Sequence, residues 1–302
     1  MPDSRRGLLL GGLAYVMWGT FPLYWTLLEP GGAVEILAHR IVWSSFTMVA
    51  LLVLLRRVPH LKALLADRHR LLLICCAAVV ITFNWGGYIW GVNNGRVVET
   101  ALGYFINPLV TVLMGVLVLG ERLRRLQWAA MAIAFVAVVV LAVDYGRPPW
   151  IALLLAFSFG TYGLLKKQAG VGAVESITVE TAVLTPFALA YVLWLVSTGA
   201  SSFGSHGVGH ALLFTTTGVI TAVPLMLFGA AAIRVSMVSL GLLQYLAPTI
   251  QFAIGVFLLH EPMPTARWLG FGLVWLALIV FTVESVNHRR RQLRLVAEAS
   301  AL

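Results

Sequence analysis

Three ionisable side chains fall inside stretches that are otherwise apolar: His39, Arg40 and Glu180. A charged group inside a bilayer is costly, and such groups usually serve binding or the movement of ions and protons. Arg40 and Glu180 lie 140 residues apart, each about two turns into its own apolar stretch. Opposite charges at related positions would suit a zwitterionic solute or a coupled proton. Glu35 lies one turn before His39, so a carboxylate–imidazole pair is also feasible.

Each of these charges also has a purely structural interpretation. The long side chain of Arg40, about 10 Å below the predicted outer surface, can extend to that surface. Glu180 can pair with Lys166 or Lys167 at the inner surface. Both interpretations stay open on the sequence alone.

Two apolar stretches, 97–119 and 237–259, each contain a proline with polar side chains on neighbouring turns. Pro108 and Pro248 supply no N–H and crowd the carbonyl four residues earlier, so each is expected to kink its helix. The polar side chains at helical spacings around them are Tyr104, Asn107, Thr111, Gln244 and Gln251. Polar groups in hydrocarbon are costly unless they face protein or a water-filled cavity. We therefore predict that they line a central substrate cavity; the alternative is that they hold helices together.

Further candidates lie in the first, third and eighth apolar stretches. Pro22 follows Trp18 by four residues and frees the Trp18 carbonyl, and Asn84 and Tyr88 share one helical face. We add Trp18, Asn84 and Tyr88 to the predicted cavity lining. An indole can stack on a flat or cationic solute; the alternative for Trp18 is a place in the aromatic belt. Pro22 and Pro224 are predicted kinks.

Catalytic and metal-binding patterns are missing from the sequence. The segment 156–160 is one substitution short of the G-x-S-x-G elbow, but it lies in a predicted helix instead of a strand–turn–helix. The adjacent Cys75 and Cys76 lack the spacing of a metal or redox motif. There is no aspartate-rich metal motif and no phosphate-binding glycine pattern. We expect no enzyme activity, no metal and no cofactor, and leave open a proton or another ion as the coupling species.

The elements that position these residues are predicted from composition. The chain has 302 residues, of which 60% are hydrophobic and 11% charged, and its mean hydropathy is +0.91. Soluble domains carry about 25% charged residues, so we expect an all-α integral membrane protein. Its net charge of +9 sits in short clusters between apolar spans, which argues against nucleic acid as a partner. Ten spans are predicted, at 7–28, 33–55, 71–93, 97–119, 124–143, 149–166, 174–196, 210–233, 237–259 and 265–285.

The lysines and arginines predict the orientation of these spans. With the N-terminus inside, 17 of the 21 fall in inside segments, and only Arg96, Arg147 and Arg267 fall outside. Positive residues stay on the cytoplasmic side, so both termini are predicted to be cytoplasmic. Residues 287–302 are then a basic cytoplasmic tail of little importance for the fold.

An internal repeat organises the whole chain. Residues 102–128 recur, without a gap, as residues 242–268, so that Pro108 matches Pro248 and Glu121 matches Glu261. The matching offset predicts two five-helix repeats, at 1–145 and 146–286. An odd number of spans inserts the second repeat upside down. Inverted repeats are a transporter architecture in which the site lies near the midplane, between the halves.

Several longer motifs resemble a known family. The segments that carry the resemblance are WGTFPLYW at 18–25, EILAHR at 35–40, NW at 84–85, VNNG at 92–95, LGYFINPL at 102–109 and QYLAPT at 244–249. Together they resemble the RarD-type permeases of the EamA branch of the drug/metabolite transporter superfamily, over about residues 7–285. The resemblance implies ten helices in two inverted repeats, in a bacterial inner membrane. It also implies export or exchange of amino acids, metabolites or drugs.

The expected function is therefore secondary active transport of a small organic solute by alternating access. The alternatives are a membrane enzyme acting on lipid and a non-transporting scaffold. The spans 124–143 and 265–285 are apolar almost throughout, so we assign them to the periphery or to the surface of a homodimer.

Overall fold

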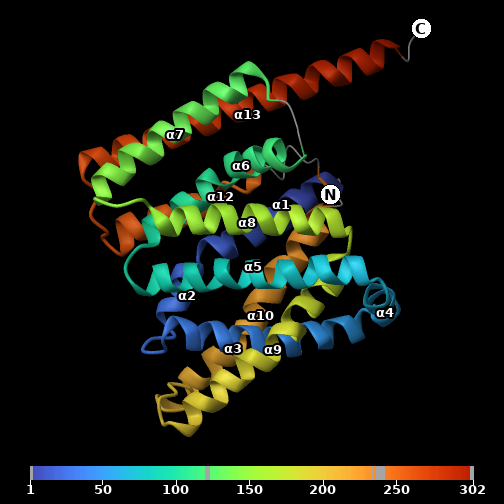
Figure 1. Ribbon diagram of the computed structural model, residues 1–302, viewed down its shortest axis with the longest axis vertical. Coiled ribbons are helices and arrows are strands. Elements are labelled where there is room, and N and C mark those ends of the chain that lie inside the picture. Colours follow the sequence, from blue (N-terminus) through green and yellow to red (C-terminus); the bar gives the residue numbers. More distant parts are fainter. Residues whose placement is uncertain (1–2, 120–122, 233, 236–241, 300–302) are drawn as a thin grey trace.

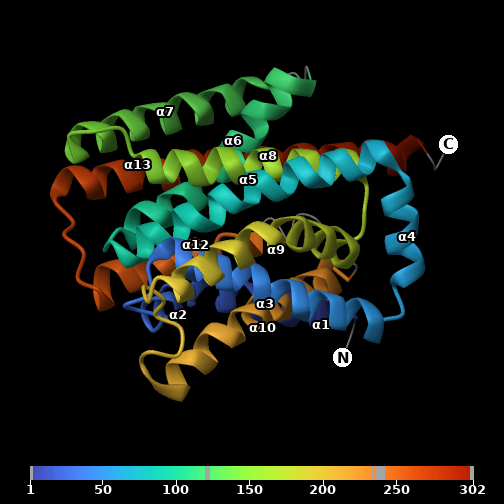
Figure 2. The ribbon, with the colours of Figure 1, turned by 60° about the horizontal axis from the view of Figure 1, so that its bottom comes forward.

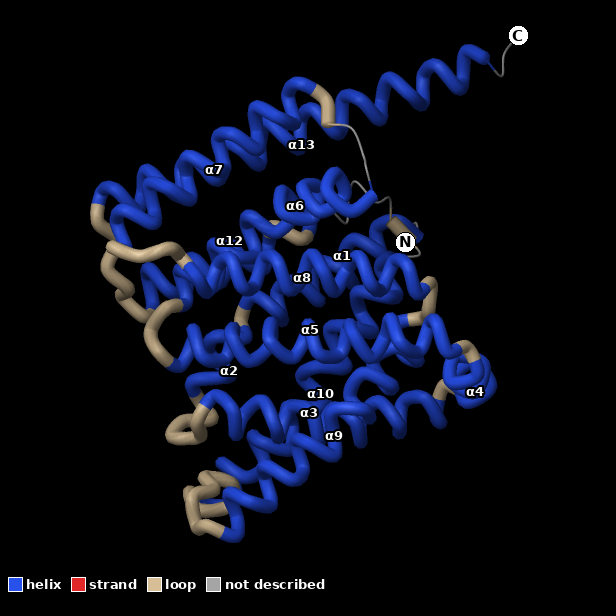
Figure 3. The backbone as a smooth tube through the Cα atoms, in the orientation of Figure 1, coloured by secondary structure: helices blue, strands red, loops and turns tan. Residues whose placement is uncertain are grey.

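Helices are the regular elements of this chain (Figure 1). The computed structural model describes residues 3–119, 123–232, 234–235 and 242–299, and this part of the chain contains no strand (Figure 3). The helices are α1 (Asp3–Gly19), α2 (Phe21–Thr26), α3 (Ala33–Leu54), α4 (Val58–Ala66), α5 (Arg68–Asn93), α6 (Val97–Leu119), α7 (Arg125–Tyr145), α8 (Trp150–Ala169), α9 (Ala173–Ser197), α10 (Gly207–Ala232), α12 (Leu246–Ala253), the π-helical η1 (Ile254–Leu258) and α13 (Thr265–Ala299).

Eight helical segments of the described chain are long and apolar enough to cross a membrane, and they coincide with eight of the ten predicted spans. The predicted span 149–166 falls on α8, which is 20 residues long and carries two lysines in its last turn. The predicted span 237–259 falls on the shorter apolar segment Leu246–Leu258 and on residues that lie partly outside the described chain. The all-helical membrane fold is thus confirmed.

The helix ends differ from the prediction in three places. The first span is divided between α1 and α2, with Pro22 in the first turn of α2. The loop predicted at 56–70 contains the helix α4. The tail predicted from residue 287 continues α13 to Ala299, as a rod that extends beyond the rest of the bundle (Figure 1).

The helices run back and forth between two ends of the bundle (Figures 1 and 2). The loops 94–96, 146–149, 198–206 and 259–264 lie at one end, at the left in Figure 1, which we call the loop end. The helix α4, the start of α1 and the α8–α9 turn lie at the other, which we call the α4 end. Among the central helices, α8 packs against both α5 and α6, and α1 packs against both α10 and α12.

The helices α7 and α13 form an antiparallel outer layer (Figure 2). An ion pair closes the layer at each end. Arg267 Nε, in the first turn of α13, lies 2.9 Å from Asp144 Oδ2 near the end of α7. Arg124 Nη2, just before α7, donates to Glu284 Oε2 of α13 at 2.7 Å. The expected place of these helices at the periphery matches this layer; a homodimer stays a prediction.

Carboxylates also join distant parts of the chain at the loop end. Glu261 accepts hydrogen bonds from the first two backbone N–H groups of α6, at Val97 and Val98. These N–H groups have no partner within their own helix, so an acid there acts as a cap. Burial raises the pKa of Glu261 even though both N–H groups act to lower it. The carboxylate therefore gives up water to hold the start of α6.

A glycine allows a close approach between α10 and α3. A Cβ added to Gly218 of α10 would lie 2.3 Å from the backbone oxygen of Trp43 and 2.5 Å from Thr47 Oγ1, both in α3. The Trp43 carbonyl belongs to the backbone of α3, and Thr47 Oγ1 is hydrogen-bonded to it at 2.8 Å, so neither atom can easily make room for a methyl group. Gly218 is therefore a point of tight packing between α10 and α3.

Candidate functional site

A cavity of about 430 Å³ lies among the central helices. Seven of the eight predicted cavity residues line it: Trp18, Asn84, Tyr88, Tyr104, Asn107, Gln244 and Gln251. Arg40 lines it as well, and Thr111 does not. The volume lies within the range of small-molecule sites, about 300–1,000 Å³. The residues come from both predicted halves of the chain; that they bind a substrate stays a prediction.

The break between α1 and α2 gives the cavity a polar link. Pro22 has no N–H to donate to the carbonyl of Trp18 four residues earlier. That carbonyl instead accepts a hydrogen bond of 3.0 Å from Gln251 Nε2 of α12. The other amide atom, Gln251 Oε1, is buried without a partner among the described residues. The proline therefore creates an acceptor that a residue 233 positions away satisfies.

Arg40 is the most unusual residue of the cavity wall. It is only 5% exposed, and its guanidinium carbon lies 4.0 Å from the ring centre of Trp85 and 5.0 Å from that of Trp25. Its Nε donates to Thr221 Oγ1 at 3.2 Å. No described carboxylate pairs with it, and Nη1 and Nη2 have no hydrogen-bond partner within the described chain. Arg40 thus does not extend to the surface; its role in binding or coupling stays a prediction.

The contacts of Arg40 are of the same order as the cost of burying its charge, but they leave its two terminal nitrogens without acceptors in the described chain. Moving an ion out of water costs several kcal/mol even after the protein relaxes. A cation–π contact returns about 1–2 kcal/mol, and one charge-assisted hydrogen bond about 1.5–3 kcal/mol. An anion in the cavity would supply the two missing hydrogen bonds and the opposite charge.

Asn84 joins three helices beside the cavity. Its Nδ2 donates to the backbone oxygen of Leu155 and to Ser158 Oγ, both at 3.0 Å. Its Oδ1 accepts from Tyr104 Oη at 3.3 Å. All the hydrogen-bonding atoms of this amide are engaged, so Asn84 positions α5, α6 and α8 and presents Tyr104 to the cavity. By contrast, Tyr88 Oη and Asn107 Oδ1 are buried without a partner in the described structure.

Glu180 lies behind the cavity wall and is neutralised there. Its Oε1 is 2.7 Å from Lys166 Nζ and 2.6 Å from Ser176 Oγ. Its Oε2 accepts from Tyr162 Oη at 3.1 Å. Lys166 and Tyr162 line the cavity, and Glu180 does not. The pairing with Lys166 is one of the two interpretations considered from the sequence, so this carboxylate already has its counter-charge.

His39 and Thr111 lie away from the cavity. The His39 ring stacks on Phe203 at 4.8 Å, and its feasible partner Glu35 instead accepts from Ser201 Oγ at 2.9 Å and from the backbone of Ser202 at 2.7 Å. The Glu35–His39 hydrogen bond considered above is therefore not formed. Thr111 is exposed on α6 beside α8.

The predicted kinks fall into two groups. Pro108 and Pro224 lie inside α6 and α10, where they interrupt the helical hydrogen bonds. Pro248 lies in the first turn of α12, directly after a turn at residues 244–245. Residues 242–243 before this turn are also helical and residues 236–241 lie outside the described chain, so a kink at Pro248 stays a prediction.

Aromatic rings complete the cavity wall, and most of them were not predicted. The additional aromatic lining residues are Tyr15, Phe21, Trp85, Phe159, Tyr162 and Phe228. Two of them had a signal in the sequence, because Gly19-Thr20-Phe21 resembles Gly160-Thr161-Tyr162 in the second half. Both Phe21 and Tyr162 line the cavity, at related positions of the two halves.

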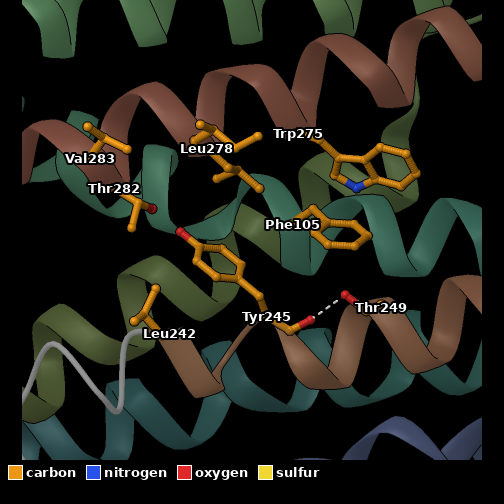
Figure 4. Close-up of a pocket in the computed structure, with 9 residues that line it drawn as sticks. Phe105, Leu242, Tyr245, Thr249, Trp275, Leu278, Thr282 and Val283 are labelled. Carbon is orange, nitrogen blue, oxygen red and sulfur yellow. Dashed lines mark hydrogen bonds between the residues drawn. The ribbon is translucent and has the colours of Figure 1, made fainter.

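A second cavity, of about 450 Å³, lies between α6, α12 and α13 (Figure 4). Its walls are mostly apolar, with Phe105 and Trp275 on one side and Tyr245 facing Thr282. No charged residue lines it, and Ile279 and Val283 beside it are more than half exposed. A polar solute finds no matching group there, so the central cavity is the better candidate for a solute site.

Comparison with known proteins gives the same class. The model of the EamA-like transporter family matches residues 5–143. A protein named RarD from Streptomyces exfoliatus is 58% identical, over 99% of this chain and 95% of its own length. An uncharacterized transporter, YojE of Bacillus subtilis (strain 168), is 42% identical over 95% of this chain and 97% of its own. Protein RarD of Escherichia coli (strain K12) is 39% identical over 96% and 98%.

One solved crystal structure has the same fold. It covers 93% of this chain and 98% of its own, with a TM-score of 0.58 and 19% identity. At that identity the likeness concerns the fold alone.

Proposed function

Because the chain belongs to the EamA-like transporter family, as a RarD-type permease and multi-pass membrane protein, we propose that it moves a small organic solute through the central cavity. The proposed mechanism is secondary active transport by alternating access across the bacterial inner membrane. The observation that carries the proposal is one cavity, about 430 Å³ in volume, whose polar and aromatic lining comes from both halves of the chain.

The neighbours of each helix support two inverted five-helix repeats. Under the 140-residue offset, α1 corresponds to α8, α3 to α9, α5 to α10, α6 to α12 and α7 to α13. The contact of α5 with α8 then corresponds to that of α10 with α1, and the contact of α6 with α8 to that of α12 with α1. The pairs α3–α9 and α7–α13 correspond to themselves. A two-fold axis in the membrane plane accounts for this pattern.

Matching carboxylates support the same relation. Glu35 and Glu175 are 140 residues apart, and each binds the segment that follows the partner helix: Glu35 the segment 201–203 after α9, and Glu175 Arg57 after α3. Asp144 and Glu284 are also 140 apart, and each pairs with an arginine at the start of the opposite helix. Counting α8 and α12–η1 with the eight long apolar helices gives the ten crossings of the proposal.

These contacts also provide a way to open the cavity at either end. At the loop end, Glu35 and Glu261 each accept backbone hydrogen bonds from the other half. At the α4 end, Glu175 pairs with Arg57 of the other half at 3.3 Å. Rocking of the halves would break the contacts at one end of the bundle while those at the other end stay formed. With the basic residues inside, the α4 end is the cytoplasmic end of the proposal.

Transport by the purified protein in proteoliposomes tests this function. Thermal-shift screening against amino acids, metabolites and drugs would first select solutes, and their flux would then be measured at two pH values to detect a coupled proton. We predict that Asn107→Ala or Gln244→Ala lowers flux without lowering expression, because both residues line the cavity. Thr111→Ala, on the same helix as Asn107 but away from the cavity, is the matched control. Flux at the unmutated rate in both cavity variants would contradict the assignment.

A further inference from the structure

We propose that the cavity selects solutes with a single anionic group, a carboxylate that Arg40 binds through Nη1 and Nη2, attached to a flat apolar body. This inference rests on the proposed transport function and names the class of its substrate. It starts from the charge balance of the cavity wall.

The charged residues that line the cavity in the described chain are Arg40 and Lys166. Lys166 is bound to Glu180 at 2.7 Å, so this pair is neutral. Arg40 has aromatic side chains around it, one hydroxyl as its hydrogen-bond partner and no carboxylate partner in the described chain. The wall therefore carries one uncompensated positive charge, and a solute with one negative charge balances it.

The geometry of Arg40 favours a carboxylate. The indole of Trp85 holds the guanidinium at 4.0 Å, and Thr221 occupies Nε, so the two terminal nitrogens are the free donors. Two parallel N–H groups match the two oxygens of a carboxylate. A phosphate monoester carries up to two charges at neutral pH, more than this wall compensates.

Of the three other unpartnered polar atoms on the wall, Tyr88 Oη can donate or accept, whereas the other two disfavour a second anionic group. Asn107 Oδ1 and Gln251 Oε1 are buried acceptors without partners in the described chain, and acceptors repel a second carboxylate. They suit an N–H or O–H donor on the solute. The cavity is also lined by aromatic rings that suit an aromatic or other flat body, those of Trp18, Tyr104, Phe159 and Phe228.

Matched sets of compounds test the inference on the purified full-length protein in detergent. One set is phenylacetate, phenylacetamide and phenethylamine; the other is indole-3-acetate, indole-3-acetamide and tryptamine. Each set keeps one ring system and one chain length and changes the polar end group from anionic to neutral to cationic. Binding is measured by calorimetric titration, and the folded state of each variant by its chromatographic profile and thermal unfolding.

The acid of at least one set is expected to bind at least about tenfold more tightly than its amide and its amine. Arg40→Gln should weaken acid binding by about 30-fold or more and remove the preference. Arg40→Lys keeps the charge without the paired donors, so an intermediate loss is expected. Arg96→Gln is the control, because Arg96 also contacts an indole, at 5.2 Å from Trp90, but does not line the cavity.

Acids that bind no better than their amides in either set would overturn the inference, and so would an acid preference that survives Arg40→Gln in folded protein. Flux in proteoliposomes separates this failure from failure of the proposed function. If the amides or amines cross at a rate that Arg40→Gln leaves unchanged, transport stands and the anion inference fails. If acids bind through Arg40 and nothing crosses, the inference stands and transport fails.

Discussion

Gln251 and Pro22 form the most specific link between the two halves at the cavity. Pro22 leaves the Trp18 carbonyl without its helical donor, and Gln251 Nε2 donates to it at 3.0 Å. The two substitutions that break this link differ in consequence. Removing Gln251 leaves the carbonyl unsatisfied, whereas restoring the N–H at position 22 makes Gln251 unnecessary there.

A double-mutant cycle therefore has a predicted sign. Gln251→Leu should destabilise the protein by about 1–3 kcal/mol, the cost of a buried acceptor without a donor. In a Pro22→Ala background, the same change should cost about 1 kcal/mol less, since the helix can supply the missing N–H. Thermal unfolding in detergent measures both, with Thr249→Val on the exposed face of α12 as control. Equal costs in the two backgrounds would show that the carbonyl and the amide are not coupled.

The sequence predicted that the Trp18 carbonyl lacks a helical donor, but it did not predict that Gln251 donates to this carbonyl. The missing N–H of Pro22 follows from covalent structure alone, whereas the partner lies 233 residues away and depends on the packing of α1 against α12. Thr111 was wrongly placed in the cavity because helical spacing gives the face of a helix but not the depth of a residue along it. It has the same helical angle as Tyr104, but seven residues move it about 10 Å along the axis, beyond the cavity.

At the scale of helices, the contact between α3 and α10 has a sharp prediction. Gly218→Ala should destabilise the protein by about 1–3 kcal/mol, because the added methyl group would overlap the Trp43 carbonyl. Gly229→Ala, in the same helix, has nothing within 4 Å and should be neutral or stabilising by about 0.5–1 kcal/mol. Thermal unfolding of the two variants compares them directly. A smaller loss for Gly218→Ala than for Gly229→Ala would contradict the packing described.

Hydropathy predicted which stretches are helices better than where they begin. Eight spans were found because a run of about 20 apolar residues is itself the condition for crossing a bilayer. The helix α8 is more polar because it contributes Tyr162 and Lys166 to the cavity. The short helix α4 was missed because it lies in a basic segment, and nine residues are too few to appear as an apolar span. Pro248 lies in the first turn of α12, directly after a turn of the chain, and proline is also compatible with that position.

At the scale of the whole molecule, the 140-residue repeat was the most informative sequence feature. It relates Glu35 to Glu175 and Asp144 to Glu284, and the structure gives each member of a pair a related contact. The differences between the halves were equally informative. Asn107 corresponds to Ala247 and Tyr104 to Gln244, and all four line the cavity. Of the charge pairs described above, only Glu180 with Lys166 was considered from the sequence, because which carboxylate neutralises which cation depends on side-chain positions in three dimensions.

Under the proposed function, the central cavity opens in turn to the two sides of the membrane. Ala247 is small, lines the cavity and lies near the middle of its span. In a background in which Cys75 and Cys76 are replaced by serine, Ala247→Cys is treated with a membrane-impermeant thiol reagent in right-side-out and in inverted vesicles. Thr111→Cys, outside the cavity, is the control. We predict labelling of Ala247→Cys from both sides; labelling from one side only, or from neither, would contradict alternating access through this cavity.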